Sequence, residues 1–364
     1  MKRFIDVHVP ISACNLQCQY CYVTHEGNRN QYKTNFKYDV NTIKKSLTQK
    51  RLGGVCHFNI CGEGETLIPN EIIEITKAIL QNGHYIMIVT NGTLTNRFED
   101  FCKFPIELRK RLGFKFSLHY LELKRKNLLQ KFTDNVKLIK EYGMSYSIEM
   151  TPTDELEEYK DEIKSFCLEK FGALCHLTIP RNMNSEKIEL LSNHSIEEFY
   201  NVWKDFDSAL FDFKYSLWGK KRNEYCYAGI WSGLLNIGTG DFSACYVGKI
   251  HQNIFENPKE KIKYIAIGSS CSLPHCYNGH SFLGLGDIPS INTTNYSLER
   301  DRITKDGEHW LNNDMREFLS HKLYDYNIEF NKKEKNKNTI NKFKYYLKKI
   351  NEKIKYKRKK NEIR

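Results

Sequence analysis

The stretch Ser12-Ala-Cys-Asn-Leu-Gln-Cys-Gln-Tyr-Cys-Tyr22 decides how this chain is interpreted. It places Cys14, Cys18 and Cys21 in a C-x3-C-x2-C array directly after an apolar run at residues 4–11. Three soft thiolates in so short a loop can hold one face of an iron–sulfur cube and leave its fourth iron open to a ligand. The alternatives are a zinc knuckle or a chance group of buried cysteines. Zinc sites usually come as two separated pairs, and no such pair lies nearby.

With Tyr20 before its last cysteine, this loop resembles the signature of radical S-adenosylmethionine (SAM) enzymes. The resemblance implies a [4Fe-4S] cluster whose open iron chelates SAM, with Tyr20 near the cofactor. An electron then cleaves SAM to methionine and a 5′-deoxyadenosyl radical, which abstracts hydrogen from the substrate. The resemblance also implies a reductant such as flavodoxin or ferredoxin.

Six short apolar, β-branched or aromatic runs indicate strands, and most stretches between them have the apolar spacing of helices. This alternation favours an α/β fold with parallel strands and right-handed crossovers. Six units match the partial (β/α)6, TIM-like barrel of the family that the cysteine loop resembles. The runs are at roughly 4–11, 56–61, 85–90, 114–118, 145–150 and 174–179.

Polar or glycine-rich residues follow every one of these runs, and in such a barrel function gathers at the carboxyl ends of the strands. The segment 62–67, Gly-Glu-Gly-Glu-Thr-Leu, resembles the Gly-Gly-Glu-Pro segment whose backbone binds the SAM amino group in the family. This aligns Gly64 and Glu65 with that role, although Thr66 replaces the usual proline. A flexible acidic turn is the plainer interpretation.

Further candidates lie at the ends of the later runs. By position, Asn91, Ser117 and His119 match cofactor-contacting residues of the resembling family, although polar strand ends are commonly just solvated. Glu149 is a candidate for binding ribose or substrate, and Arg181 could pair with a carboxylate. Both residues more often form structural salt bridges.

Four later cysteines form a second set, Cys226, Cys245, Cys271 and Cys276. The pattern Cys226-x13-Gly240-x4-Cys245, with a glycine-turned hairpin at 234–246, resembles the opening of SPASM and twitch extensions, which hold auxiliary clusters. Four cysteines suffice for one [4Fe-4S] cluster of the twitch kind. Tetrahedral zinc is the alternative. The remaining cysteines, by default, are buried small hydrophobes: Cys56, Cys61, Cys102, Cys167 and Cys175.

The expected organisation has five parts. It comprises a barrel at 1–182, a helical connector at 183–222 with Ser195 as N-cap, a twitch-like domain at 223–290, a helical segment at 291–330 and a basic tail at 331–364.

The positive charge is concentrated in the tail. Of 56 Lys/Arg and 44 Asp/Glu, residues 331–364 hold 15 and 3, so 41 and 41 remain and the body is neutral. Ile340, Phe343, Leu347, Ile350 and Ile354 have the spacing of one helical face, which predicts a basic amphipathic helix. Such a helix could bind an anionic membrane surface or an acidic partner. The alternatives are that it packs its apolar face onto its own barrel or that it is disordered. Nucleic acid is the least favoured partner because the body has no basic surplus.

Twelve cysteines without a secretory signal, and no apolar stretch of membrane-spanning length, favour the cytoplasm, with membrane-surface association through the tail as an option. We therefore expect a radical SAM enzyme that carries out an oxidation or related tailoring step on a small molecule, sugar- or aminocyclitol-like, or on a peptide. The alternatives are a nucleic-acid-modifying radical SAM enzyme and a non-catalytic iron–sulfur redox or scaffold protein.

Overall fold

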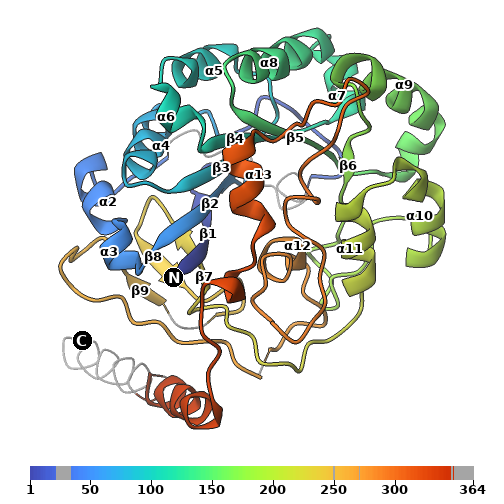
Figure 1. Ribbon diagram of the computed structural model, residues 1–364. Coiled ribbons are helices and arrows are strands. Elements are labelled where there is room, and N and C mark those ends of the chain that lie inside the picture. The colour runs from blue at the N-terminus through green and yellow to red at the C-terminus, as the bar shows by residue number, and fades with distance from the viewer. Residues whose placement is uncertain (22–33, 249–250, 270, 346, 348–364) are drawn as a thin grey trace, which may run out of the picture.

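The computed structural model describes residues 1–21, 34–248, 251–269, 271–345 and 347. In this part of the chain, nine strands form one sheet in the order β6-β5-β4-β3-β2-β1-β7-β8-β9 (Figure 1). The order is linear, so the sheet curves around a centre without closing. This is the partial, TIM-like α/β barrel that the sequence predicted.

The first six strands lie close to the six predicted runs. They are β1 (Lys2–Val9), β2 (Val55–Gly62), β3 (Tyr85–Thr90), β4 (Leu112–Ser117), β5 (Ser145–Met150) and β6 (His176–Leu177). Each is parallel to its neighbour. Their carboxyl ends therefore meet at one rim, which is where the polar segments follow.

Three further strands extend the sheet on the other side of β1. β7 (Ser232–Asn236) runs parallel to β1, while β8 (Asp241–Ser243) and β9 (His251–Asn253) continue antiparallel. The expected hairpin is present between β7 and β8, and Gly240 takes the positive φ of 78° in its turn. Part of the 223–290 region is thus joined by hydrogen bonds to the first barrel strand.

Helices cover the outer face of the sheet, as the ring of helices around the strands in Figure 1 shows. This face is apolar, with Val7, Ile60, Ile88 and Phe114 fully buried in one core because β-branched and aromatic side chains alternate along each strand. The helices are α2 (Val40–Ser46), α3 (Gln49–Leu52), α4 (Glu71–Gln81), α5 (Thr95–Cys102), α6 (Ile106–Arg109), α7 (Tyr120–Arg125), α8 (Leu129–Glu141) and α9 (Lys160–Phe171).

The connector at 183–222 contains α10 (Ile196–Trp203) and α11 (Ala209–Leu217). Ser195 is the N-cap of α10, as predicted, and forms a capping box with Glu198. The helical expectation for 291–330 is largely wrong. Its regular elements are α13 (Asn313–Ser320) and the short turn η3 (Leu323–Asp325), and most of the preceding residues run in turns and extended segments against the barrel.

This C-terminal part fills the inner side of the sheet, where Figure 1 shows α12 (Gly279–Phe282) and α13 over the strands. Phe282 packs edge-on against Phe4 of β1, with ring centroids 5.3 Å apart. At the amino end of β3, Tyr85 stacks on Phe318 of α13 at 3.8 Å. The amino ends of the strands are therefore covered by α13, and the carboxyl rim is left for the cysteine loop.

Residues 332–345 of the basic tail are helical, whereas Ile350 and Ile354 lie outside the described residues. The helix contacts the body through Asn338, which pairs with both the amide and the carbonyl of Ala266. Its apolar stripe faces away, since Ile340, Phe343 and Leu347 are 53, 62 and 44 % exposed. Among the described residues, no helix combines the length and apolar character needed to cross a bilayer.

Candidate functional site

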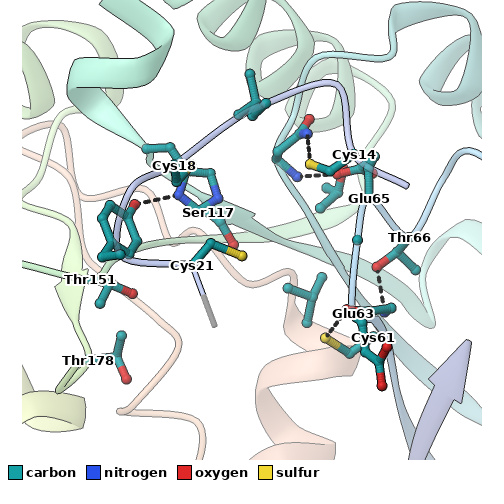
Figure 2. Close-up of a pocket in the computed structure, with 18 of the residues that line it drawn as sticks. Cys14, Cys18, Cys21, Cys61, Glu63, Glu65, Thr66, Ser117, Thr151 and Thr178 are labelled. Carbon is teal, nitrogen blue, oxygen red and sulfur yellow. Dashed lines mark hydrogen bonds between the residues drawn. The ribbon is translucent and has the colours of Figure 1, made fainter. Parts of the chain in front are cut away.

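The three thiols of the cysteine loop share one cavity of about 270 Å³ at the carboxyl ends of the parallel strands. Cys18 is buried, Cys14 and Cys21 are half-buried, and all three are free thiols. Figure 2 shows Cys18 and Cys21 on one side of the cavity and Cys14 on the other, beside Glu65. Of the sequence-predicted barrel residues, the cavity wall contains Cys14, Cys18, Tyr20, Cys21, Gly64, Glu65, Asn91, Ser117, His119 and Arg181, and omits Glu149.

The donor set fits an iron–sulfur cluster. Burial raises the pKa of the Cys14 thiol, so a thiolate here is costly unless a cation compensates its charge. Asn91 Nδ2 lies 3.7 Å from Cys14 Sγ and can donate to it. A short loop of soft ligands with an amide donor at one sulfur is the kind of environment in which iron–sulfur clusters are held and tuned.

Gly64 and Glu65 bind the cysteine loop through their backbone. The amide of Gly64 donates to Ile11 O at 2.7 Å, and that of Glu65 donates to Ala13 O at 2.9 Å. A Cβ on Gly64 would lie 2.0 Å from Ala13 O, so only glycine permits this approach. The close contact puts the 62–67 segment and the thiols on the same cavity.

The Glu65 carboxylate is a structural tie between two strand ends. It accepts from Thr90 Oγ1 at 2.7 Å, from the Asn91 amide at 2.7 Å and from the Leu67 amide at 3.0 Å. Burial raises the pKa of Glu65, and these three donors act in the opposite direction. The carboxylate therefore holds the end of β2 against the end of β3.

Asn91 connects this tie to the cysteine loop. Its Nδ2 donates to Asn15 Oδ1 at 2.7 Å as well as to Cys14, and its Oδ1 accepts from the Thr93 amide and hydroxyl at 3.1 and 2.7 Å. With both ends of the amide engaged, the side chain has one orientation. It fixes the position of the loop residue next to Cys14.

Tyr20 and His119 form a pair on the opposite wall, with Tyr20 Oη 2.5 Å from His119 Nδ1. Burial lowers the pKa of His119 to about 4, so the ring is neutral at pH 7 and Nδ1 can accept from the hydroxyl. Ser117, two residues before His119, lines the same wall. The pair anchors the loop between Cys18 and Cys21 to the end of β4.

Arg181 and Glu149 bind groups outside the cavity. Arg181 Nη1 donates to Tyr277 O at 3.1 Å and to Asn278 Oδ1 at 2.9 Å, and its guanidinium lies 4.7 Å from the centre of the Tyr277 ring. Glu149 Oε1 accepts from Arg300 Nη1 at 2.9 Å. Both side chains are thus joined to the C-terminal part that fills the barrel.

The second cysteine set also lies together. Cys226, Cys245, Cys271 and Cys276 line a cavity of about 40 Å³ whose other walls are mainly apolar. Burial raises the pKa of the Cys245 thiol to about 11 and also raises that of Cys226 and Cys276. Four such thiols fit a group that supplies positive charge, which both an iron–sulfur cluster and zinc would do.

Several residues of the main cavity were not predicted as site residues, among them Cys61, Thr151 and Thr178. Cys61, expected to be a buried hydrophobe, is half-buried and lines the wall, whereas Cys56, Cys102, Cys167 and Cys175 are buried as expected. Thr151 and Thr178 follow β5 and β6 and lie near each other in Figure 2. The position of each threonine at the end of a predicted strand was the available signal in the sequence. Threonine is too common at strand ends for the position alone to identify a site residue.

Residues 9–167 match the family model described as the radical SAM superfamily. This segment, just under half of the chain, is similar to that superfamily and contains the cysteine loop and the strands β2 to β5. The superfamily works with a [4Fe-4S] cluster and SAM, as the sequence predicted. Among curated proteins, none matches the sequence.

Solved structures of similar fold include SuiB of Streptococcus suis bound to S-adenosylmethionine, with 16 % identity over 70 % of this chain and a TM-score of 0.50. The match covers 64 % of SuiB, so this chain spans just under two thirds of that protein's length. Native anSMEcpe with bound AdoMet and Kp18Cys peptide has 18 % identity over 72 % of this chain and 80 % of its own, also at 0.50. At these identities the likeness establishes the fold alone.

Proposed function

We propose that this protein is a radical SAM enzyme that performs an oxidation or related tailoring step on a small-molecule, sugar- or aminocyclitol-like substrate or on a peptide. When bound, a [4Fe-4S] cluster with an open iron and SAM supply a 5′-deoxyadenosyl radical that abstracts hydrogen from the substrate. The observation that carries the proposal is the cavity in which three free thiols face the polar ends of the parallel strands.

Two groups of residues would have different roles at this cavity. Cys14, Cys18 and Cys21 would hold the cluster, and the remaining lining residues would bind and orient SAM. These are Tyr20, Gly64, Glu65, Asn91, Ser117 and His119. Because the Glu65 carboxylate already accepts three hydrogen bonds, it is the backbone of 64–65 that we assign to the cofactor.

For the second cavity we propose an auxiliary [4Fe-4S] cluster on Cys226, Cys245, Cys271 and Cys276. Zinc would draw four thiolates to about 3.8 Å from one another, given zinc–sulfur bonds of about 2.3 Å. The iron–sulfur assignment rests on the spacing Cys226-x13-Gly240-x4-Cys245, which resembles the opening of auxiliary-cluster domains.

A packed route joins the two cavities and supports an oxidation. Arg181 lines the first cavity and its guanidinium rests on Tyr277, which lines the second. The ring of Tyr246, also at the second cavity, is 5.6 Å from that of Tyr277. An auxiliary cluster so placed could accept the electron that a substrate radical must lose to become an oxidised product.

Peptides are included in the substrate class because two structural neighbours, SuiB bound to the precursor peptide SuiA and anSMEcpe with the Kp18Cys peptide, are peptide complexes. The basic tail helix we assign to an acidic partner, for which the reductant, a flavodoxin or ferredoxin, is the main candidate. We place the enzyme in the cytoplasm. An anionic membrane surface is the alternative binding partner of the tail.

The test is turnover without oxygen. Protein reconstituted with iron and sulfide, then given dithionite and SAM, should form 5′-deoxyadenosine, and Cys18→Ala should abolish it. A matched variant, Cys102→Ala, alters a buried thiol outside both cavities and should retain product formation. If the wild type keeps an intact cluster yet forms no 5′-deoxyadenosine with candidate substrates supplied, the non-catalytic interpretation is correct.

A further inference from the structure

The inner side of the barrel, below the cysteine cavity, contains polar side chains that are fully buried and lack partners. Within the described residues, both ring nitrogens of His57, Ser147 Oγ and Tyr296 Oη have no hydrogen-bond partner. His57 and Tyr296 lie together, with ring centroids 5.8 Å apart. Because a buried polar group without a partner is costly, such a group of them indicates a site for a polar ligand.

Arg300 is the strongest member of this group. Its side chain has no exposed surface, and its Nη1 donates to Glu149 Oε1 at 2.9 Å. Its Nε and Nη2 form no hydrogen bond of ordinary geometry within the described residues, and besides Glu149 the Tyr296 side chain interacts with the guanidinium. These two nitrogens form one edge of the guanidinium, and that edge matches the two oxygens of a carboxylate or phosphate. The guanidinium also lies 4.8 Å from the centre of the Tyr296 ring, which fixes its plane.

The location connects this edge to the cysteine cavity. Glu149, which holds Arg300, pairs in register with Ser117 and stands two residues before Thr151. Ser117 and Thr151 both line the cavity. The side chain of Glu149 keeps 17 % of its surface exposed while Arg300 keeps none, so the pair reaches from the accessible side of the barrel into its sealed interior.

The charges around the pair favour an anion. The charged groups that act on Lys214 of α11 are Glu149 and three cations, Lys115, Arg181 and Arg300. Lys214 and these three cations also act on His280. Two further carboxylates lie nearby. Glu299, which acts on Arg300, accepts from Thr294 Oγ1 at 3.1 Å, and Asp6 is engaged by Asn59 Nδ2 at 2.7 Å and Tyr246 Oη at 2.6 Å. One further negative group would offset the excess of buried positive charge.

We propose that the buried polar cluster of His57, Ser147, Glu149, Tyr296 and Arg300 binds an anionic oxygen group of the substrate. The Nε–Nη2 edge of Arg300 receives two oxygens of a carboxylate or phosphate, and Glu149 holds the guanidinium in place. The inference rests on the proposed function only in naming the bound molecule as the substrate. An anion anchored here leaves the rest of the molecule to extend toward the thiol-lined cavity.

The experiment measures thermal unfolding of the full chain with inorganic phosphate or acetate, each compared with chloride at equal ionic strength. We expect at least one anion to raise the unfolding midpoint saturably in the wild type. Arg300→Gln should abolish this shift, and Arg300→Lys should retain a weaker one, because an ammonium is a point charge without the paired edge. Arg125→Gln, which removes an exposed arginine on α7, is the matched control and should keep the shift.

A shift that is equal in wild type and Arg300→Gln, or no shift with either anion, overturns the proposal. If Arg300→Gln does not fold, Glu149→Gln decides the matter. That variant leaves Arg300 without its acidic partner, so anion affinity should rise several-fold, and unchanged or weaker affinity overturns the proposal. The relative affinities of phosphate and acetate identify the group. Because no turnover is measured, the result is independent of whether 5′-deoxyadenosine forms.

Discussion

The two cysteine sites of this chain differ in how much space they leave beside their thiols. Cys14, Cys18 and Cys21 come from one eight-residue loop and line a cavity of about 270 Å³ with polar strand ends opposite. The second set is drawn from residues 226–276 and lines a cavity of about 40 Å³ with mainly apolar walls. The cysteine loop supplies three thiols to the first cavity, and Cys61 of β2 lines it separately, whereas the second cavity is lined by four thiols.

This difference in space indicates which site could bind another molecule beside its cluster. Three thiols next to a large polar cavity leave one iron of a cube unclaimed and provide hydrogen-bonding groups for whatever binds it. Four thiols in a small apolar cavity can satisfy every iron and leave little room for anything else. We therefore expect chemistry on a bound molecule at the first site and a structural or electron-accepting role at the second.

Replacement of a cluster-binding cysteine should have the largest effect on the two sites. Wild type should hold about eight irons, as two cubes of four, and Cys18→Ala or Cys276→Ala should each lose about half of them. Only Cys18→Ala should lose the change in the paramagnetic signal when SAM is added, because only the first site has an open iron. Iron and sulfide counts with electron paramagnetic resonance on anaerobic protein provide both measurements.

Cys102→Ala serves as the control, with both clusters and the response to SAM retained. A SAM response that survives in Cys18→Ala and vanishes in Cys276→Ala would reverse the assignment of the two sites. About four irons in the wild type, together with bound zinc, would remove the auxiliary cluster.

Asn91 provides a second test of the difference between the two sites, because its side-chain amide donates to Cys14 Sγ at the first site. Asn91→Ala removes this donor and its hydrogen bond to Asn15, so we expect SAM affinity to fall about 10- to 100-fold and the potential of the first cluster to shift. Asn82→Ala is the matched control, because the side-chain Nδ2 of Asn82 donates to the backbone carbonyls of Lys44 and Leu47, outside the cavity. Equal SAM affinity in the two variants would show that Asn91 is merely structural.

Much of this architecture could be predicted because its signals are local. Apolar β-branched runs located β1 to β6, and the Ser195 to Glu198 spacing located the start of α10. The cysteine loop was recognisable because three ligands fall within eight residues. A site built from the ends of consecutive parallel strands inherits this predictability, since each strand end is marked in the sequence.

The rest depends on contacts between distant residues. The pairing of β7 with β1 joins residues more than 220 positions apart, and a five-residue strand carries no sign of its neighbour. Glu149 could be proposed as a site residue, but its partner Arg300 lies 151 positions later, in a segment expected to be helical. The inner side of the barrel was therefore invisible until the C-terminal part was in place.

We expect the smallest effect from changes in the basic tail. Its helix contacts the protein beside the second site and not the first. Lys342 Nζ donates to Ile267 O at 2.7 Å, and Ile267 lines the four-cysteine cavity. The exposed stripe of Ile340, Phe343 and Leu347 and the surrounding lysines then form a surface suited to an acidic electron carrier. Phe343→Ser combined with Lys344→Glu should weaken the binding of flavodoxin roughly tenfold at low salt.

The measurement is binding by calorimetry across a salt series, since an electrostatic contact must weaken as salt rises. Lys131→Glu makes the same charge change on exposed α8, at the outer face of the barrel, and should leave affinity nearly unchanged. Equal loss in the two variants would mean that overall charge, and not this surface, attracts the carrier. Co-sedimentation of wild type with anionic vesicles, abolished by the tail variant while flavodoxin affinity is unaltered, would assign the tail to a membrane surface instead.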